Sequence, residues 1–273
     1  MPRRRIRPAL AAFAGLALAV TAAGAAGASP CPDPQAGPPY SFTTELVGPG
    51  KPIPLKNMAL LSRTKHGYRY QAGQQNSHLT ITQGHGRVRF VDTGTAKWKR
   101  AVPAACRRLR VSKGIAASCR VPSGTTVGQP LLIEVWPRLG NDYVDGRTLP
   151  ATDSLSVLAD AGNDVAHLGA GRDFFNGYSG HDLVFGGAGN DWIRSGPDND
   201  LVHAGAGNDY VVGQDGPDTL YGDSGSDKLY GSNGNDQLVG GSGQDRLSCG
   251  PGADKTLMER QDSSNSCETV SYQ

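Results

Sequence analysis

The sequence has 273 residues, of which 38 are glycine and 37% are hydrophobic, and its net charge is +2 at pH 7. Glycine is about twice as frequent as in an ordinary globular protein, and the low hydrophobic content excludes a chain built around one large compact core. The small net charge conceals a division: residues 29–138 hold sixteen Lys and Arg against four Asp and Glu, whereas residues 139–273 hold seven against twenty-one. A basic region therefore precedes an acidic one.

The N-terminus has the pattern of a secretory signal peptide. "MPRRRIRP" is basic, "ALAAFAGLALAV" is apolar, and "AGA" at 26–28 is a small-x-small cleavage site, so we expect a signal peptide over 1–28 and a secreted, extracellular mature protein. The apolar run is short for a membrane span, and an uncleaved anchor is the alternative. No other segment is apolar enough, so we expect no membrane span after cleavage.

Export makes disulfides possible, because they persist outside the cytosol. The spacing of the five cysteines suggests two local pairs, Cys106–Cys119 and Cys249–Cys267, with Cys31 left over. Spacing alone does not establish connectivity. Zinc is disfavoured as an alternative, because the chain has no C-x-x-C motif and no histidine pair at ligand spacing.

A Pro-rich segment over 29–40, expected to be extended, leads into a basic, β-rich region over 41–138. The alternating runs "HLTITQ" at 78–83 and "RVRFVD" at 87–92 predict strands. We interpret this region as a small N-terminal cap domain or as an irregular extension of the fold formed by the acidic half of the chain. The stretch "IEVWPRLGNDYVDG" runs directly into the first rung, which favours a continuous stack without a linker.

The stretch "KWKRAVPAACRRLRVSKG" at 97–114 is strongly basic. One hypothesis is an anionic partner, such as a cell-wall or surface polymer, with possible association with the cell surface. The alternative is a solvated basic face, or a face attracted to the acidic half of the chain. A nucleic-acid partner is not expected, because no recognised nucleic-acid-binding motif is present.

An aspartate recurs every nine residues from residue 164 to residue 254. With each Asp at position six of a nonapeptide, position four is Gly in every repeat except one, where Asp198 stands. Position eight is large and apolar in all repeats but the first and last. Positions one to six have the composition of a turn, and positions seven to nine form a short β-prone segment.

A three-residue strand cannot bury its apolar side chain alone, whereas stacked strands about 4.8 Å apart can do so together. Two nonapeptides would form one coil of eighteen residues, with a strand on each side. The pattern therefore predicts an all-β fold whose main part is a parallel β-roll over 139–257. Residues 258–273 lose the repeat and are expected to form a C-terminal cap, which Cys267 could attach to Cys249.

The repeats "GGAGNDWIR" at 186–194, "AGAGNDYVV" at 204–212 and "GGSGQDRLS" at 240–248 closely resemble the nonapeptide of RTX, or haemolysin-type, calcium-binding proteins. The tail "CGPGAD … CE" is similar to that of secreted actinobacterial proteins with this repeat. The resemblance implies several Ca²⁺ ions, bound by the position-six aspartates and by main-chain carbonyl groups of the glycine-rich turns. The carbonyl groups are expected near Gly162, Gly171, Gly180, Gly189, Gly207, Gly216, Gly225, Gly234 and Gly243.

Calcium needs six to eight oxygen ligands, so one Asp per turn must be supplemented by main-chain oxygens. Because alternate repeats occupy opposite edges of the coil, two rows of sites are expected. One row holds Asp164, Asp182, Asp200, Asp218, Asp236 and Asp254, and the other holds Asp173, Asp191, Asp209, Asp227 and Asp245. An acidic turn without an ion, the structural alternative, would repel its stacked neighbours. Mg²⁺ fits less well, because it demands a compact octahedron.

Two further aspartates, Asp142 and Asp153, precede the strict series at steps of eleven residues. Their turns are poor in glycine, so we expect them to be rungs of the fold and not metal sites. Asp254 ends the array and has no later repeat to pair with.

No catalytic motif accompanies the repeats. The chain lacks H-E-x-x-H and G-x-S-x-G, and "GDSG" at 222–225 falls within the repeat frame. We therefore predict a structural or interaction module, adhesin-like in character, and not an enzyme. The alternative is a small hydrolase or other effector within 41–138 that uses the roll as a calcium-dependent folding aid.

Overall fold

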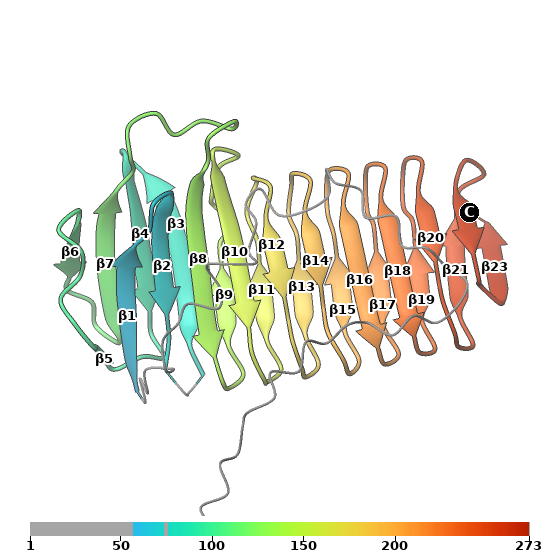
Figure 1. Cartoon of the computed structure of the whole chain (residues 1–273), viewed down its shortest axis with the longest axis horizontal. Helices are drawn as coiled ribbons and strands as arrows, with labels where there is room; N and C mark the ends of the chain where they lie inside the picture. Colours follow the sequence, from blue (N-terminus) through green and yellow to red (C-terminus); the bar gives the residue numbers. More distant parts are fainter. Residues whose placement is uncertain (1–56, 74–75, 273) are drawn as a thin grey trace, which may run out of the picture. The chain divides into compact units, whose positions relative to one another are not determined.

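The computed structural model describes residues 57–73 and 76–272, and these residues form β-strands and no helix (Figure 1). None of them forms a helix able to cross a membrane. One sheet contains β1 (Met58–Arg63), β2 (Gly67–Gln71), β5 (Lys97–Trp98), β8 (Leu131–Arg138), β10 (Asp153–Ala159), β12 (Phe174–Asn176), β14 (Trp192–Arg194), β16 (Tyr210–Asp215), β18 (Lys228–Asn233), β20 (Arg246–Ser248) and β22 (Ser263–Asn265). The other contains β3 (His78–Gly84), β4 (Arg87–Asp92), β6 (Cys106–Leu109), β7 (Ile115–Arg120), β9 (Tyr143–Asp145), β11 (Val165–His167), β13 (Leu183–Phe185), β15 (Leu201–His203), β17 (Thr219–Tyr221), β19 (Gln237–Val239), β21 (Lys255–Met258) and β23 (Thr269–Tyr272).

From β8 onward the chain alternates between the two sheets, and every neighbouring pair is parallel. Strand β14 pairs with β16 so that Trp192 lies beside Tyr210 and Ile193 beside Val211, a step of eighteen residues. Strands β13 and β15 pair at the same step in the other sheet. The predicted all-β fold and its parallel β-roll are confirmed.

The core of the roll is a single column of apolar side chains between the two sheets. It is built from position eight of each repeat, and nearly all of its side chains have no exposed surface. Its members are Ala166, Phe175, Val184, Ile193, Val202, Val211, Leu220, Leu229, Leu238 and Leu247. A thin core of this kind accounts for the low hydrophobic content of the chain.

The N-terminal part continues both sheets. Strand β2 pairs in parallel with β8, and β3 pairs in parallel with β9. Beyond them the pairing turns antiparallel, as between β3 and β4 and between β4 and β7. Tyr68, Tyr70 and Phe90 fill the core there, and Trp98 packs edge-on against Tyr70 with ring centroids 6.2 Å apart. The basic region is thus an extension of the roll, and Trp98 contributes to its packing.

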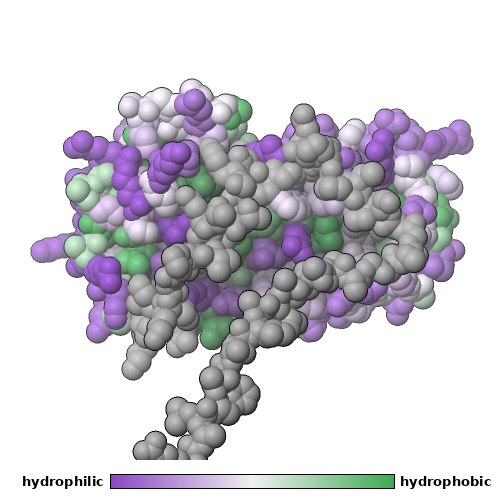
Figure 2. Space-filling view, in the orientation of Figure 1, coloured by the Kyte–Doolittle hydropathy of each residue, from purple (hydrophilic) through white to green (hydrophobic). Residues whose placement is uncertain are grey.

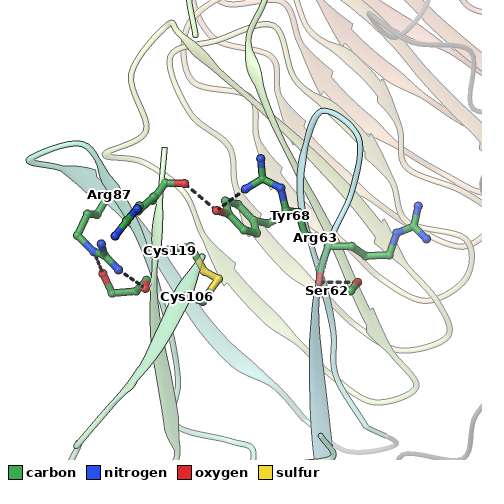
Figure 3. The surroundings of a disulfide bond; sticks show 9 residues. Ser62, Arg63, Tyr68, Arg87, Cys106 and Cys119 are labelled. Carbon is green, nitrogen blue, oxygen red and sulfur yellow. Dashed lines mark hydrogen bonds between the residues drawn. A yellow bond between two sulfur atoms is a disulfide. The ribbon is translucent and has the colours of Figure 1, made fainter. Parts of the chain in front are cut away.

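A disulfide joins the two strands at one edge of this extension (Figure 3). Cys106 and Cys119 are directly paired in the antiparallel register of β6 and β7. Nearby, the Tyr68 hydroxyl donates a hydrogen bond to the Arg120 carbonyl at 2.6 Å, and the Arg87 guanidinium donates to Ser118. The disulfide therefore attaches the edge strand β6 to β7, and side chains of β2 and β4 in turn hold β7.

The second disulfide, Cys249–Cys267, attaches the C-terminal segment to the last coil. Although the nonapeptide pattern stops here, strand pairing continues: β22 adds to β20, and β23 adds to β21. The cap therefore covers both sheets with one further strand each. Cys31, the expected signal peptide and the Pro-rich segment lie outside the described residues.

Candidate metal centres

The position-six aspartates of successive coils form two continuous ladders. In each step the Oδ1 atom of one Asp accepts the main-chain N–H of the Asp in the preceding coil. Asp209 accepts from Asp191 at 2.7 Å, and Asp227 accepts from Asp209 at 2.8 Å. The same bond joins Asp164, Asp182, Asp200, Asp218, Asp236 and Asp254 along the other edge. The structure thus brings the predicted residues together in the two predicted rows.

The second carboxylate oxygen of most of these residues has no partner. The side chains are at most 4% exposed, and the Oδ2 atoms are buried without a hydrogen bond. This holds for Asp142, Asp164, Asp182, Asp191, Asp200, Asp209, Asp218, Asp227, Asp236, Asp245 and Asp254. A buried carboxylate oxygen without a partner is costly. Its regular recurrence fits a row of sites that each give the oxygen a cationic partner.

Burial also determines the acidity of these groups in the absence of metal. Loss of hydration is the largest of the causes that raise the pKa of Asp182, Asp218 and Asp227 to about 8, and the charges of neighbouring aspartates contribute to this rise. The main-chain N–H from the preceding coil acts in the opposite direction and lowers the pKa. At neutral pH these three carboxyl groups therefore hold protons in the absence of metal, and a cation would displace them.

In the repeats whose position one is glycine, that residue leaves space beside Oδ2. A Cβ atom at Gly186 would lie 2.9 Å from Asp191 Oδ2 and would collide with the carbonyl oxygen of Ala204, one coil later. A Cβ at Gly222 would similarly lie 2.6 Å from Asp227 Oδ2 and would collide with the carbonyl oxygen of Gly240. Glycine thus leaves a notch between a carboxylate oxygen and a main-chain oxygen.

Position four supplies further oxygens. In the described turns, the carbonyl groups of Gly189, Gly207 and Gly225 accept no main-chain hydrogen bond. Gly189 has φ of +114°, a region that residues with a Cβ rarely adopt. Asp198, the one exception at this position, adopts φ of +85°. The glycines are therefore needed for geometry that leaves carbonyl oxygens unpaired.

Among the described residues, no three His, Cys, Asp or Glu side chains converge on one point. An ion in these turns would therefore depend on main-chain carbonyl oxygens as well as carboxylates. An all-oxygen set of this composition suits Ca²⁺, which accepts six to eight such ligands in flexible geometry. The residues present fit the ion implied by the repeat.

Asp173 departs from this pattern. Its Oδ1 accepts the N–H of Leu155 and its Oδ2 accepts the N–H of Gly169, both at 2.7 Å. Position one of its repeat is the buried Leu168 in place of glycine. Both carboxylate oxygens therefore serve the main chain, and the turn lacks the notch found at Gly186.

The two early aspartates also differ from each other. Asp142, in a glycine-poor turn, accepts the N–H of Ser77 and keeps a buried, unpartnered Oδ2 like the later residues. Asp153 begins β10, and its carboxylate accepts the Thr152 hydroxyl at 3.5 Å. Asp142 is the one that shares the feature expected of a metal ligand.

Two carboxylates that the repeat pattern did not identify continue the ladders into the cap. Asp262 Oδ1 accepts the N–H of Asp245 at 3.1 Å, and Glu268 Oε2 accepts the N–H of Asp254 at 2.9 Å. Their spacings of 17 and 14 residues miss the period of 18. A search for acids at slightly shortened steps after the last repeats could have found them.

The acidic side chains of the described N-terminal part and the serine of "GDSG" make structural contacts. Asp92 is buried and accepts hydrogen bonds from Tyr70, Ser77 and Thr95, and Glu134 pairs with Arg69. In "GDSG", the Ser224 hydroxyl donates to a main-chain carbonyl of the preceding coil. These contacts hold the described fold together.

A family model of the RTX calcium-binding nonapeptide repeat matches the chain four times, at residues 158–193, 176–211, 185–220 and 212–247. No curated protein matches the chain significantly. The matched segments contain the ladder aspartates from Asp164 to Asp245. The resemblance seen in the sequence is thereby confirmed: residues 158–247 contain four matches to the RTX calcium-binding nonapeptide repeat.

Proposed function

We propose that the β-roll binds several Ca²⁺ ions through the position-six aspartates and the unpaired carbonyl groups of its turns, and that it folds on binding them. The observation that carries the proposal is the buried, unpartnered Oδ2 that recurs in repeat after repeat and that faces a notch where position one is glycine, as at Asp191 and Gly186. Asp173 is assigned a structural role, because main-chain donors occupy both of its oxygens.

Coupled folding and binding is a consequence of electrostatics. Without an ion, each ladder stacks buried carboxyl groups that must either hold a proton or repel their neighbours. Divalent cations neutralise this charge only when the coils are stacked, so metal-binding free energy becomes folding free energy. Calcium at extracellular levels would favour the folded roll, which agrees with a secreted protein.

The test is calorimetric calcium titration of the mature protein together with circular dichroism. We expect binding of several ions and a gain in β structure between EGTA and millimolar Ca²⁺, with a smaller response to Mg²⁺. Equal β content in EGTA and in calcium would contradict folding on binding, and absence of binding heat would contradict the calcium sites.

We further propose that the ordered protein is a structural or interaction module of adhesin-like character, whose basic surface contacts an anionic cell-wall or surface polymer. Between residues 57 and 133 the only acidic residue is Asp92, which is buried. The basic side chains of the stretch at 97–114 are exposed, and Arg107 and Arg108 lie on the edge strand β6. In the view of Figure 2, hydrophilic side chains cover much of the part formed by β1 to β7.

This second part of the proposal is tested by co-sedimentation with anionic cell-wall polymer at increasing salt. Charge reversal of Arg107 and Arg108 to Glu should reduce retention, because neighbouring positive charges attract the polymer. Reversal of Arg246 and Arg260, exposed in the acidic half, is the matched control. Equal retention of both variants, or binding that is insensitive to salt, would count against an electrostatic surface.

A further inference from the structure

The ladder that runs from Asp173 to Asp245 ends at an unusual notch next to the C-terminal cap. Position one of its last repeat is Gly240, where a Cβ would lie 2.6 Å from Asp245 Oδ2 and 3.1 Å from Asp262 Oδ2. In the preceding repeats of this row, at Gly186 and Gly222, the oxygen opposite the aspartate is a main-chain carbonyl. Gly240 therefore lies between two carboxylates, one from the roll and one from the cap.

The two carboxylates are held firmly on either side of the notch. Asp245 has no exposed surface; its Oδ1 accepts the N–H of Asp227 at 2.9 Å and its Oδ2 has no partner. Asp262 accepts the N–H of Asp245 with Oδ1 and that of Glu259 with Oδ2, at 3.1 and 2.6 Å. Each oxygen of an ionised carboxylate has more than one acceptor site, so Asp262 Oδ2 can serve both Glu259 and a cation.

Charge repulsion adds to burial at this point. Burial is the main cause of the raised pKa of Asp245, and the charges of Asp262 and Glu259 raise it further. The surroundings of Asp245 thus contain negative charge from both of these carboxylates. A divalent ion between Asp245 and Asp262 would remove the repulsion and give the buried Oδ2 a partner.

We propose that Asp245 and Asp262 together bind a Ca²⁺ ion at Gly240, so that one ion joins the roll to its C-terminal cap. The inference rests on the proposed calcium-binding function and extends it to a residue outside the nonapeptide repeats. Two carboxylates replace the carboxylate and carbonyl of the earlier notches, and a higher ligand charge strengthens calcium binding. The disulfide Cys249–Cys267 holds the cap in place and preorganises Asp262.

Native mass spectrometry of the full mature chain, titrated with Ca²⁺, counts the ions directly. We expect Asp262→Asn to bind one ion fewer than the wild type, with the circular dichroism of the calcium-saturated roll retained. Gly240→Ala should lose the same ion, because the methyl group occupies the notch while the charge of the cap is unchanged. The chain itself carries an alanine at position one of another repeat, Ala204, so this residue type is compatible with the fold.

Two variants serve as matched controls. Asp145→Asn removes one carboxylate charge at a surface ion pair with Arg147, and Gly84→Ala adds a methyl group with no atom within 4 Å. Both should bind the wild-type number of ions. If Asp262→Asn does not fold in saturating calcium, Gly240→Ala decides alone. A wild-type ion count for Gly240→Ala overturns the inference, whereas absence of calcium binding in the wild type overturns the proposed function itself.

Discussion

Asp191 Oδ1 accepts the main-chain N–H of Asp173 at 2.8 Å, while Asp191 Oδ2 is buried with no partner at all. Asp173 occupies the same place in its own repeat, yet both of its oxygens accept main-chain N–H groups. Two aspartates at the same position of the repeat therefore differ in the hydrogen-bond partners of their carboxylate oxygens. One has an oxygen available to a cation, and the other completes the hydrogen bonding of the turn.

This difference predicts opposite effects of the same substitution. Asp191→Asn should bind fewer calcium ions, because a neutral amide replaces the carboxylate that faces the notch. Asp173→Asn should keep the ion count and lose about 1–3 kcal/mol of unfolding free energy, because the new amide N–H₂ meets a main-chain donor. Native mass spectrometry and denaturant unfolding in calcium measure the two quantities, and a lost ion in Asp173→Asn would refute the structural assignment.

Position one offers a reciprocal pair of substitutions. Gly186→Ala should weaken calcium binding, because its methyl group would occupy the space between Asp191 Oδ2 and the Ala204 carbonyl oxygen. Ala204→Gly should open the corresponding space beside Asp209 and strengthen binding there. The calcium midpoint of the circular dichroism transition reports both effects. If both substitutions shifted the calcium midpoint in the same direction, the space beside the aspartate would not be what determines calcium affinity.

The raised pKa values predict an inverted pH dependence for the calcium-free roll. Folded Asp182, Asp218 and Asp227 have pKa values of about 8, whereas an unfolded Asp titrates near pH 4. Between these values the folded state holds more protons, so the contribution of these groups to the unfolding free energy is full below about pH 4 and is lost as pH rises through about 8.

Calcium should reverse the trend, because it binds ionised carboxylates and protons compete with it. Thermal unfolding from pH 4 to pH 8 in EGTA and in millimolar calcium checks both directions. If the unfolding temperature changed with pH by the same slope in EGTA and in calcium, the proposed competition between protons and calcium would be contradicted.

Tyr178 occupies position two with φ of +75° and is 60% exposed. A left-handed conformation costs an L-residue about 1–2 kcal/mol. Glycine would remove this strain, but ordering glycine on folding costs more chain entropy, which offsets part of the gain. Tyr178→Gly should therefore raise the unfolding free energy in calcium by up to about 1 kcal/mol. Tyr178→Ala, which keeps the backbone strain, is the control, and an equal gain from alanine would exclude strain as the cause.

The disulfide Cys106–Cys119 closes a loop of 13 residues at the edge of the N-terminal extension. Replacement of both cysteines by serine should lower the unfolding free energy of this part by about 3 kcal/mol. The calcium count should not change, because β6 and β7 lie outside the two ladders. Denaturant unfolding followed by calcium titration separates the two outcomes.

The roll could be predicted in detail because a strict period of nine assigns every residue to a turn or a strand. The environment of Asp173 could not be predicted from the period. It depends on the burial of Leu168 and on the hydrogen bond from the Gly169 N–H to Asp173 Oδ2, and both are properties of the folded turn. The strands around 78–83 and 87–92 were expected, whereas the parallel pairing of β3 with β9 joins segments far apart in the chain. Asp262 escaped prediction because its step is one residue short of the period.

The ladders have a polarity that makes the two ends of the roll chemically unequal. Each step runs from a main-chain donor to a carboxylate in the next coil, so the first coils require donors before them and the last coils require acceptors after them. Ser77 and Leu155 supply N–H groups at one end, and Asp262 and Glu268 supply carboxylates at the other. The caps are therefore not interchangeable, and a roll extended by grafting coils must keep its acidic terminus last.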